Sequence, residues 1–467
     1  MVLKPDRSKA SSDKKREKPA GELRRHQPDR PGFAVRAAAT KILGAVLERR
    51  LPLDGALDNE HGNPVYKALS ESDRALVRAI LHASLRNLPR IEAAIDLLLE
   101  TPLPDGARSL RHVLIVGAVQ VLYLDVPDHS AVDLAVEQAN RDPRNRRFAK
   151  LVNAVLRRLG REKEETLEKI SDVPLVPKWF FDRLIAAYGA EKAFAISQSQ
   201  LQPAAIDLTT KSNADEWAQR LSGVVLPTGS VRLRPFAGAI PSLDGFAEGH
   251  WWVQDAAASI PARLFGDLTG KRVADLCAAP GGKTAQLVMA GASVTAIDLS
   301  ENRLRRLRSN LERLHLQAET IATDLTTFLP DEPFDAILLD APCSSTGTTR
   351  RHPDVLWTKD ADDIKRLAML QERLLRHAVS LLKVGGTIVF SNCSLDPEEG
   401  EAVVARVLAD MPNLERVAID PTAWPALEDA ITPLGEFRTL PSMLDMKQPD
   451  VTSGLDGFYA AVLRRLA

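Results

Sequence analysis

The chain has 467 residues, of which 45% are hydrophobic and 26% charged, and its formal net charge is −1. This composition is typical of a globular protein with about two to four domains. It excludes a uniformly basic surface, so any binding to nucleic acid must come from local patches. No apolar run approaches the roughly 18 residues that span a bilayer, and the opening MVLKPDRSK is charged where a signal peptide would be apolar. Three widely spaced cysteines argue against a disulfide framework, so we expect a cytoplasmic protein.

Residues 1–33 are expected to form a disordered basic tail. Residues 1–32 hold ten Lys or Arg, five Asp or Glu and four prolines, with few large apolar side chains. Two interpretations stay open, namely a solubilising leader and a non-specific electrostatic arm for RNA.

Residues 34–165 show helical periodicity and no strand-like alternation, which predicts an all-α bundle. Apolar residues recur at steps of three and four in segments 34–50, 74–100, 113–125, 130–140 and 149–160. Between Arg141 and Lys163 there are nine basic and two acidic residues, a local charge of +7. A solvated helix face explains part of this excess, but its size favours contact with RNA phosphates.

Residues 166–235 are interrupted by prolines and predict a small connector subdomain. One or two helices are expected, at 180–189 and 214–222, together with a few strands.

Residues 236–467 show a different pattern, in which predicted strands and helices alternate. Strands are expected at 271–276, 293–298, 319–323, 334–340, 387–392 and 457–465. Helices are expected at 283–291, 304–314, 364–383 and 397–411. Such alternation is typical of a doubly wound α/β domain.

All three cysteines follow directly after predicted strands. Cys277, Cys343 and Cys393 come after the first, fourth and fifth strands of this domain. Ligands of such sheets bind beyond the carboxyl ends of the parallel strands, so we expect the three thiols to face one crevice. A single cysteine is most often a small buried hydrophobe, but three at one edge indicate that at least one has a chemical role.

The loop DLCAAPGGKT, residues 275–284, indicates what binds in the crevice. Its Pro-Gly-Gly turn permits close approach of the backbone to a ligand at a helix N-terminus. A P-loop is excluded because Cys277 stands where that motif requires Gly, and the dinucleotide motif is also missing. Asp298 can bind ribose hydroxyls and Asp324 can contact a base, although both could instead cap helices. A nucleoside without a phosphate cradle indicates S-adenosylmethionine.

The remaining thiols suggest a reaction at cytosine, whose C5 is a poor nucleophile. A thiolate that adds to C6 makes C5 electron-rich enough to accept a methyl group, after which the C5 proton and the thiol must leave. The spacing does not decide between Cys343 and Cys393 as this nucleophile.

Thiolates form near cationic groups, and Arg350, Arg351 and His352 follow Cys343 closely enough to be candidates. Arginines on a loop are more often surface or phosphate contacts. Asp340 could accept a hydrogen bond from either the cytosine amino group or the methionine amine.

These motifs resemble a known family. DLCAAPGGKT, Asp298, Asp324, DAPCSSTGTTRRHPD (340–354) and SNCSLDPEEGE (391–401) are similar in order and spacing to the motifs of the RNA cytosine-C5 methyltransferases, the Sun/NOL1/NOP2 family. RRHPD and the N-terminal helices resemble the bacterial RsmB type, which acts on 16S rRNA. The resemblance implies a multidomain fold with an N-terminal all-α NusB-like bundle, a small α+β connector and a C-terminal α/β Rossmann-like class I methyltransferase domain.

The resemblance also implies roles for particular residues. Cys393 corresponds to the nucleophile and Cys343 to the thiol that helps to release the product. No metal is implied. The residues that correspond to the binding site of S-adenosyl-L-methionine are Cys277, Ala278, Ala279, Pro280, Gly281, Gly282, Lys283, Asp298, Asp324 and Asp340.

The chain departs from the family pattern at two places. Asn392 precedes Cys393 where Thr is usual, and Ser344-Ser345 stands where Ser-Gly or Ser-Ala is usual. VQDAAAS, residues 253–259, resembles a family segment at the entrance of the donor site. The adjacent Trp251 and Trp252 are more typical of core residues than of base-stacking platforms.

The function implied is a cytoplasmic methyltransferase that modifies C5 of an unstacked cytosine in 16S rRNA, either naked or in a partly assembled small subunit. No membrane and no obligate protein partner are expected. One alternative is a related enzyme that acts on tRNA or 23S rRNA. Another is a catalytically inactive, NusB-like RNA-binding factor, against which the intact thiols argue.

Overall fold

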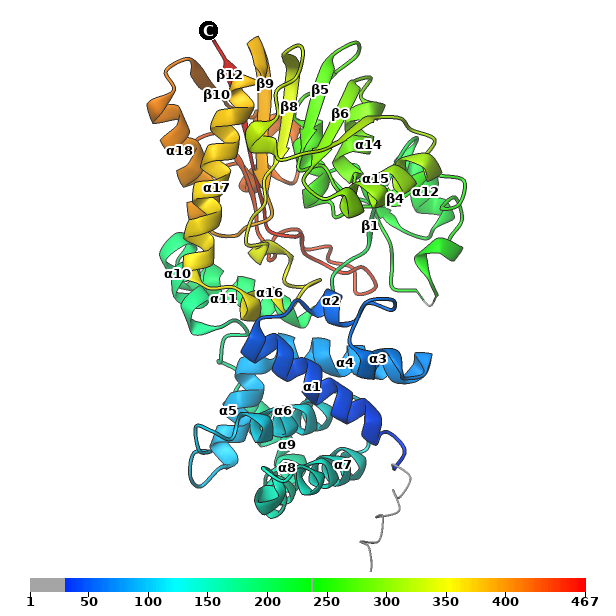
Figure 1. The fold of residues 1–467 in the computed structure, drawn as a ribbon, viewed down its shortest axis with the longest axis vertical. Coiled ribbons are helices and arrows are strands. Elements are labelled where there is room, and N and C mark those ends of the chain that lie inside the picture. The colour runs from blue at the N-terminus through cyan, green and yellow to red at the C-terminus, as the bar shows by residue number, and fades with distance from the viewer. Residues whose placement is uncertain (1–29, 237) are drawn as a thin grey trace, which may run out of the picture.

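The computed structural model describes residues 30–236 and 238–467 (Figure 1). The predicted tail lies outside this part of the chain except for its last four residues, 30–33. A helical part occupies the lower half of Figure 1 and an α/β part the upper half, with the connector helices between them. Over the described residues, none of the helices combines the length and apolar character needed to cross a bilayer.

The N-terminal part is all helical, as the periodicity predicts. Its helices are α1 (Phe33–Arg49), α2 (Leu53–Ala56), α3 (Pro64–Lys67), α4 (Glu71–Arg86), α5 (Leu88–Leu98), α6 (Arg108–Tyr123), α7 (Asp128–Arg141), α8 (Ala149–Arg161) and α9 (Lys163–Lys169). Helix α6 is buried along most of its length and packs against α1, α4, α5, α7 and α8. It therefore forms the centre of the bundle.

The periodic segment 74–100 is divided into two helices. Helix α4 ends at the C-cap Asn87, and α5 begins at Leu88 with Pro89 in its first turn. Proline has no N–H to continue the helix before it, but it fits the first turn of a new one. The apolar spacing continues across the break, so periodicity alone did not show it.

The connector contains α10 (Lys178–Tyr188) and α11 (Ala190–Gln198), followed by a small antiparallel sheet in the order β2-β3-β1-β4. This sheet consists of β1 (Asp207–Thr210), β2 (Val224–Val225), β3 (Val231–Arg232) and β4 (Trp251–Val253), with α12 (Ala214–Arg220) packed beside it. The strand β4 pairs with β1, so the sheet draws on residues on both sides of position 235.

The C-terminal part is built on a large sheet in the order β10-β12-β9-β8-β5-β6-β7, with β11 paired to β12. Its strands are β5 (Arg272–Leu276), β6 (Ser293–Asp298), β7 (Glu319–Ala322), β8 (Phe334–Asp340), β9 (Leu382–Asn392), β10 (Leu414–Val417), β11 (Phe437–Thr439) and β12 (Phe458–Arg465). Its helices are α13 (Ile260–Arg263), α14 (Gly282–Met289), α15 (Glu301–Arg313), α16 (Val355–Thr358), α17 (Ala361–Ser380) and α18 (Glu401–Asp410).

The two faces of the sheet bury alternate residues of the same strand. Leu338 of β8 packs in the cluster that contains Leu287 of α14, whereas Leu339 packs in the cluster that contains Leu375 of α17. Because both faces are covered by helices, β8 is apolar along most of its length, as expected of a buried parallel strand. The predicted doubly wound α/β architecture is confirmed.

Strands β7, β6, β5, β8 and β9 are mutually parallel, so their carboxyl ends share one edge of the sheet. The chain moves from β5 to β6 on one side and returns to β8 on the other. The gap between the ends of β5 and β8 is thus a topological switch point, where ligands of open α/β sheets bind.

The helical part contacts the C-terminal part through the segment that follows the Cys343 loop. Arg86 donates a hydrogen bond to the carbonyl of Arg350 (2.6 Å), and Trp357 donates one to the carbonyl of Leu85 (3.1 Å). The backbone N–H of Leu53 donates to Asp354 (2.9 Å). The RRHPD segment is therefore held between the two parts of the molecule.

Candidate active site

The three cysteines lie at the carboxyl edge of the sheet, just past β5, β8 and β9. All three line one cavity of about 490 Å³. The sulfur atoms of Cys343 and Cys393 are 3.5 Å apart, within hydrogen-bonding distance for sulfur. The strands β8 and β9 are neighbours in register, with Asp340 opposite Ser391, which brings the two following loops together.

Cys277 differs from the other two thiols. Its backbone has φ 64°, a left-handed conformation that is uncommon for a residue with a Cβ. Burial, together with the negative charges of Asp340, Asp298 and Asp275, raises the pKa of its thiol to about 12. Cys277 therefore remains a neutral thiol at physiological pH and is unsuited to act as a nucleophile.

The pKa values of Cys343 and Cys393 are shifted in opposite directions. The pKa of Cys393 is lowered, chiefly because the Cys343 thiol donates a hydrogen bond to its sulfur, and the charge of Lys283 adds to this effect. The pKa of Cys343 is raised well above its usual value by the same hydrogen bond, by burial and by nearby negative charge. The arrangement therefore favours a thiolate at Cys393 beside a neutral thiol at Cys343.

Lys283 and Asp340 form a partly buried ion pair at the switch point. The Lys283 Nζ lies 2.7 Å from Asp340 Oδ2, and Ser391 donates a hydrogen bond to Asp340 Oδ1 (3.0 Å). Burial lowers the pKa of Lys283, but the neighbouring Asp340 outweighs burial and raises it overall. The lysine thus keeps its charge close to the Cys393 sulfur.

The loop between β5 and α14 brings the backbone against the cavity. Gly281 has φ 102°, and a Cβ at this position would lie 2.8 Å from the side chain of Leu307, so only glycine fits. The backbone N–H of Ala279 donates to Asp298 at the end of β6 (3.3 Å). This contact ties the loop to the acid that follows the neighbouring strand.

Asp298 and Asp324 both line the cavity of the three cysteines. The cap of α15 is Ser300, whose side chain accepts from the N–H of Arg303, so the capping alternative for Asp298 is wrong. Asp324 does cap a short 3₁₀ turn through the N–H of Thr326, so it combines capping with a place in the cavity wall.

Asp275 of β5 is a buried carboxylate next to this site. Its Oδ2 accepts a hydrogen bond from Thr284 (2.6 Å), whereas its Oδ1 is buried and has no hydrogen-bond partner among the described residues. Burial raises the pKa of this carboxyl to about 7. Asp275 also borders a second cavity of about 420 Å³, which shares Ala279 and Asp340 with the first and is lined by Lys283 as well. An orphaned acceptor here fits a ligand that brings its own N–H donors.

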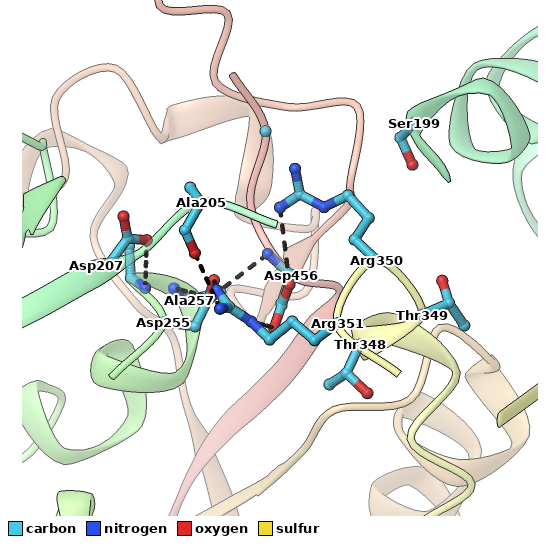
Figure 2. A network of polar contacts seen from close by, with 12 residues as sticks. Ser199, Ala205, Asp207, Asp255, Ala257, Thr348, Thr349, Arg350, Arg351 and Asp456 are labelled. Atoms are coloured by element: carbon cyan, nitrogen blue, oxygen red, sulfur yellow. Dashed lines mark hydrogen bonds and ion pairs between the residues drawn. The ribbon is translucent and has the colours of Figure 1, made fainter. Parts of the chain in front are cut away.

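The arginines after Cys343 do not act on the thiols, which corrects the hypothesis drawn from their position in the sequence. Arg351 binds Asp255 (2.5 Å), Asp456 (2.9 Å) and the carbonyl of Ala205 (2.9 Å), as Figure 2 shows. Arg350 points toward Asp456 from the other side, with a nitrogen–oxygen distance of 3.7 Å.

His352 pairs with Asp54 of the helical part at 3.1 Å. The cation near the nucleophile pair is instead Lys283, which is 60 residues before Cys343 in the chain. Sequence proximity was misleading here because the chain turns away from the crevice after Cys343.

The tryptophans beside the entrance segment are core residues, as expected. Trp251 and Trp252 are both buried, and the indole N–H of Trp252 donates to Gln254 (2.8 Å). Trp252 and the first residues of segment 253–259 line the second cavity.

Asn392, one of the two departures from the family pattern, contacts an acid whose role sequence reasoning missed. Glu399 accepts hydrogen bonds from the N–H of Ser344 (2.8 Å) and from the hydroxyl of Ser394 (2.6 Å). Asn392 donates to the carbonyl of Glu399 (2.7 Å) and accepts from the N–H of Ser394 (2.9 Å). The only signal was the acidic run after Cys393, which a sequence reader assigns to the surface.

The connector also reaches the nucleophile loop. Arg183 of α10 forms an ion pair with Asp396 and another with Glu398 (2.8 Å), and Tyr188 donates to the carbonyl of Leu395 (2.6 Å). The loop after β9 is therefore held by two sets of contacts, one to the side chain of Glu399 and the other to helix α10 of the connector.

Comparison with known proteins identifies the family. The model of the 16S rRNA methyltransferase RsmB/F family matches residues 267–464, and that of the NusB family matches residues 34–161. Ribosomal RNA small subunit methyltransferase B of Klebsiella pneumoniae subsp. pneumoniae is 34% identical over 448 residues, covering 92% of this chain and 98% of the relative. Its namesake from Vibrio vulnificus is 35% identical over 454 residues, covering 93% and 100%. The chain belongs to this methyltransferase family.

Solved structures agree on the fold. A protein described as PH0851 superposes with a TM-score of 0.68 at 22% identity, covering 94% of this chain and all of its own. A methyltransferase homolog protein from Pyrococcus horikoshii has a TM-score of 0.51 at 29% identity, covering 62% of this chain and 95% of its own. The NusB-like bundle and the class I methyltransferase domain are thus confirmed, and the chain is an RNA methyltransferase whose methyl donor is S-adenosyl-L-methionine.

Proposed function

We propose that this protein transfers the methyl group of S-adenosyl-L-methionine to C5 of a cytosine in 16S rRNA, through a covalent bond between Cys393 and C6 of the base. The pair of thiols carries the proposal, because a sulfur with a lowered pKa lies 3.5 Å from a neutral thiol in the wall of the cavity. The name of the relatives, ribosomal RNA small subunit methyltransferase B, supports 16S rRNA as the substrate.

The chain's residues fit the methyl donor. When bound, S-adenosyl-L-methionine supplies an electrophilic methyl group on a sulfonium. Asp298 and Asp324 would hold the nucleoside end, since carboxylates accept hydrogen bonds from ribose hydroxyls and base amines. The unpaired Oδ1 of Asp275 would accept from the methionine ammonium, and the loop 277–283 would approach the donor through its backbone.

Bond formation to the base begins at Cys393. Its thiolate adds to C6, the electrons of the C5–C6 double bond move to C5, and C5 then takes the methyl group. Lys283 and Asp340 lie where they would contact the polar edge of the cytosine, with the lysine stabilising negative charge that develops on the ring.

Product release reverses the first step. A base removes the C5 proton, the C5–C6 double bond re-forms, and the carbon–sulfur bond breaks with its electrons returning to the Cys393 sulfur. Cys343 would assist this step, because a thiol that donates a hydrogen bond to the departing sulfur stabilises it as a thiolate.

The helical part would hold the RNA. The substrate would be 16S rRNA in the cytoplasm, either naked or in a partly assembled small subunit. In α8 the apolar stripe of Val152, Val155 and Leu159 is buried, while Arg157 and Arg161 are exposed. An amphipathic helix with arginines on its open face suits phosphate contacts that are not specific for sequence.

The direct test is to incubate the protein with S-adenosyl-L-methionine and 16S rRNA, 23S rRNA or tRNA, and to identify the product by nucleoside mass spectrometry. We expect 5-methylcytidine in 16S rRNA alone, retained with Cys277→Ala and abolished by Cys393→Ala. Methylation of another RNA, or at another atom, would contradict the proposal.

A further inference from the structure

Glu399 is a buried carboxylate that joins the two cysteine loops. It ends a short 3₁₀ turn after β9, and its side chain is 0% exposed. Its Oε1 accepts hydrogen bonds from the N–H of Ser344 (2.8 Å) and from Gln371 of α17 (3.0 Å). Its Oε2 accepts from the hydroxyls of Ser344 and Ser394. One side chain thus binds the residue after Cys343, the residue after Cys393 and the helix that covers both.

All four of these partners are hydrogen-bond donors, which fits an ionised carboxylate. Burial raises the pKa of Glu399, and the hydrogen bonds from Ser344 and Ser394 act against burial by stabilising the charged form. In the described part of the chain, no Lys or Arg forms an ion pair with Glu399. Its negative charge is therefore balanced by hydrogen bonds alone and acts on whatever lies close by.

The hydroxyl groups around Glu399 complete the link between the loops. Thr346 Oγ1 accepts from the N–H of Leu395 (2.9 Å) and lies 3.3 Å from the Ser394 hydroxyl. The N–H of Gly347 donates to the carbonyl of Cys393 (2.8 Å). The two loops are therefore joined both by direct contacts and by hydrogen bonds that converge on one carboxylate.

We propose that Glu399 is a positioning residue, which fixes the Cys343 loop against the Cys393 loop and keeps Cys343 as the protonated member of the pair. The inference rests on the proposed function, in which Cys343 assists the departure of Cys393 from the product. A protonated Cys343 can donate a hydrogen bond to the leaving sulfur, whereas two thiolates at this distance would repel each other.

The charges around the pair act in this direction. Asp340 raises the pKa of Cys393 and Lys283 lowers it, so these two partly cancel at the nucleophile. The pKa of Cys343 is raised first by its hydrogen bond to Cys393, then by burial, and then by the charges of Cys393 and Glu399. The charge of Glu399 therefore raises the pKa of Cys343, the thiol that does not attack the base. Asp396, the other carboxylate of this loop, is paired with Arg183 on the far side.

The test compares Glu399→Gln with Glu436→Gln, a matched control. Glu436 is also fully buried in the same domain, but it pairs with Arg416 and touches neither cysteine loop. Gln at position 399 keeps the size and one acceptor while removing the charge, so the variant is expected to fold, as circular dichroism would verify. Each variant is treated with iodoacetamide across a pH series, and peptide mass spectrometry reports the alkylation of each cysteine.

We expect Cys393 to be alkylated at lower pH than Cys343 in the wild-type protein. In Glu399→Gln the onset for Cys343 should move to lower pH, and methyl transfer to 16S rRNA should fall roughly 100-fold through misplacement of the loops. Glu436→Gln should change neither. An unchanged onset for Cys343 in Glu399→Gln would overturn the inference. The alkylation result is independent of methyl transfer, so a wild-type protein that makes no 5-methylcytidine would refute the proposed function without deciding the role of Glu399.

Discussion

Replacing Arg351 by Met tests whether the network in Figure 2 stabilises the junction of the connector, the entrance segment and the C-terminal loop. Arg351 donates to Asp255, Asp456 and the carbonyl of Ala205, and both carboxylates are buried. Without Arg351 the nearest cation to Asp456 is Arg350, at 3.7 Å. Removing one partner of a buried ion pair costs about 3–5 kcal/mol, since the other charge stays buried.

For a domain of this size such a loss lowers the Tm by roughly 10 °C, which differential scanning calorimetry measures directly. The loss should also grow with pH. Burial already raises the pKa of Asp456 to about 6, whereas the charge of Arg351 helps to lower the pKa of Asp255 against burial. Without Arg351 the pKa of each carboxyl therefore moves upward in the folded protein. A folded-state pKa above the unfolded value gives stability that is lost as pH rises, so the Tm difference should be larger at about pH 8 than at about pH 5.

The matched control is Arg50→Met, which removes an exposed pair with Asp360 (2.7 Å). Exposed ion pairs contribute little to stability, so we expect the Tm of this variant to stay close to that of the wild type. Equal Tm losses for Arg351→Met and Arg50→Met, or a loss that does not depend on pH, would refute the reasoning.

Further predictions concern the crevice. Cys277→Ala should keep methyl transfer within about threefold of the wild type, because a thiol with a pKa of about 12 supplies no thiolate; a loss beyond that would show a chemical role. Lys283→Met should move the pH of Cys393 alkylation upward by removing a charge that lowers its pKa, and an unchanged onset would exclude this role. Asp298→Ala should weaken binding of S-adenosylhomocysteine in calorimetry by roughly 10-fold to 100-fold, through loss of charge-assisted hydrogen bonds, and equal affinity would place the ribose elsewhere. Burial raises the pKa of Asp275 from 3.8 to about 7, so the ligand-free wild type should lose stability relative to Asp275→Asn as pH rises through that range, and parallel stability curves would contradict the burial of its charge.

Much of the fold could be predicted because its signals are local. The alternation of strands and helices identified the α/β domain, and the position of each cysteine after a strand brought all three to one cavity. The short strands β10 and β11 were missed, because four or three residues carry too little pattern to separate a strand from a loop. The break at Asn87 was missed because apolar spacing persists through it.

The parts of the site that escaped prediction depend on contacts between distant segments. Arg351 follows Cys343 closely in sequence, yet its partners are Asp255 and Asp456, about a hundred residues away on either side. Glu399 lies in an acidic run, where a charged residue is expected to be solvated. The four donors that bind its carboxylate in the interior come together only when the chain folds. Pairing of this kind cannot be derived from spacing along one chain.

The measurement that tests the central claim most directly is covalent trapping with 16S rRNA that contains 5-fluorocytosine. Fluorine at C5 cannot leave as a proton does, so the methylated base should stay attached to the protein in the presence of S-adenosyl-L-methionine. We expect a stable protein–RNA adduct with the wild type and with Cys343→Ala, and none with Cys393→Ala. An adduct that persists in Cys393→Ala, or that is lost only in Cys343→Ala, would contradict the assignment of the nucleophile.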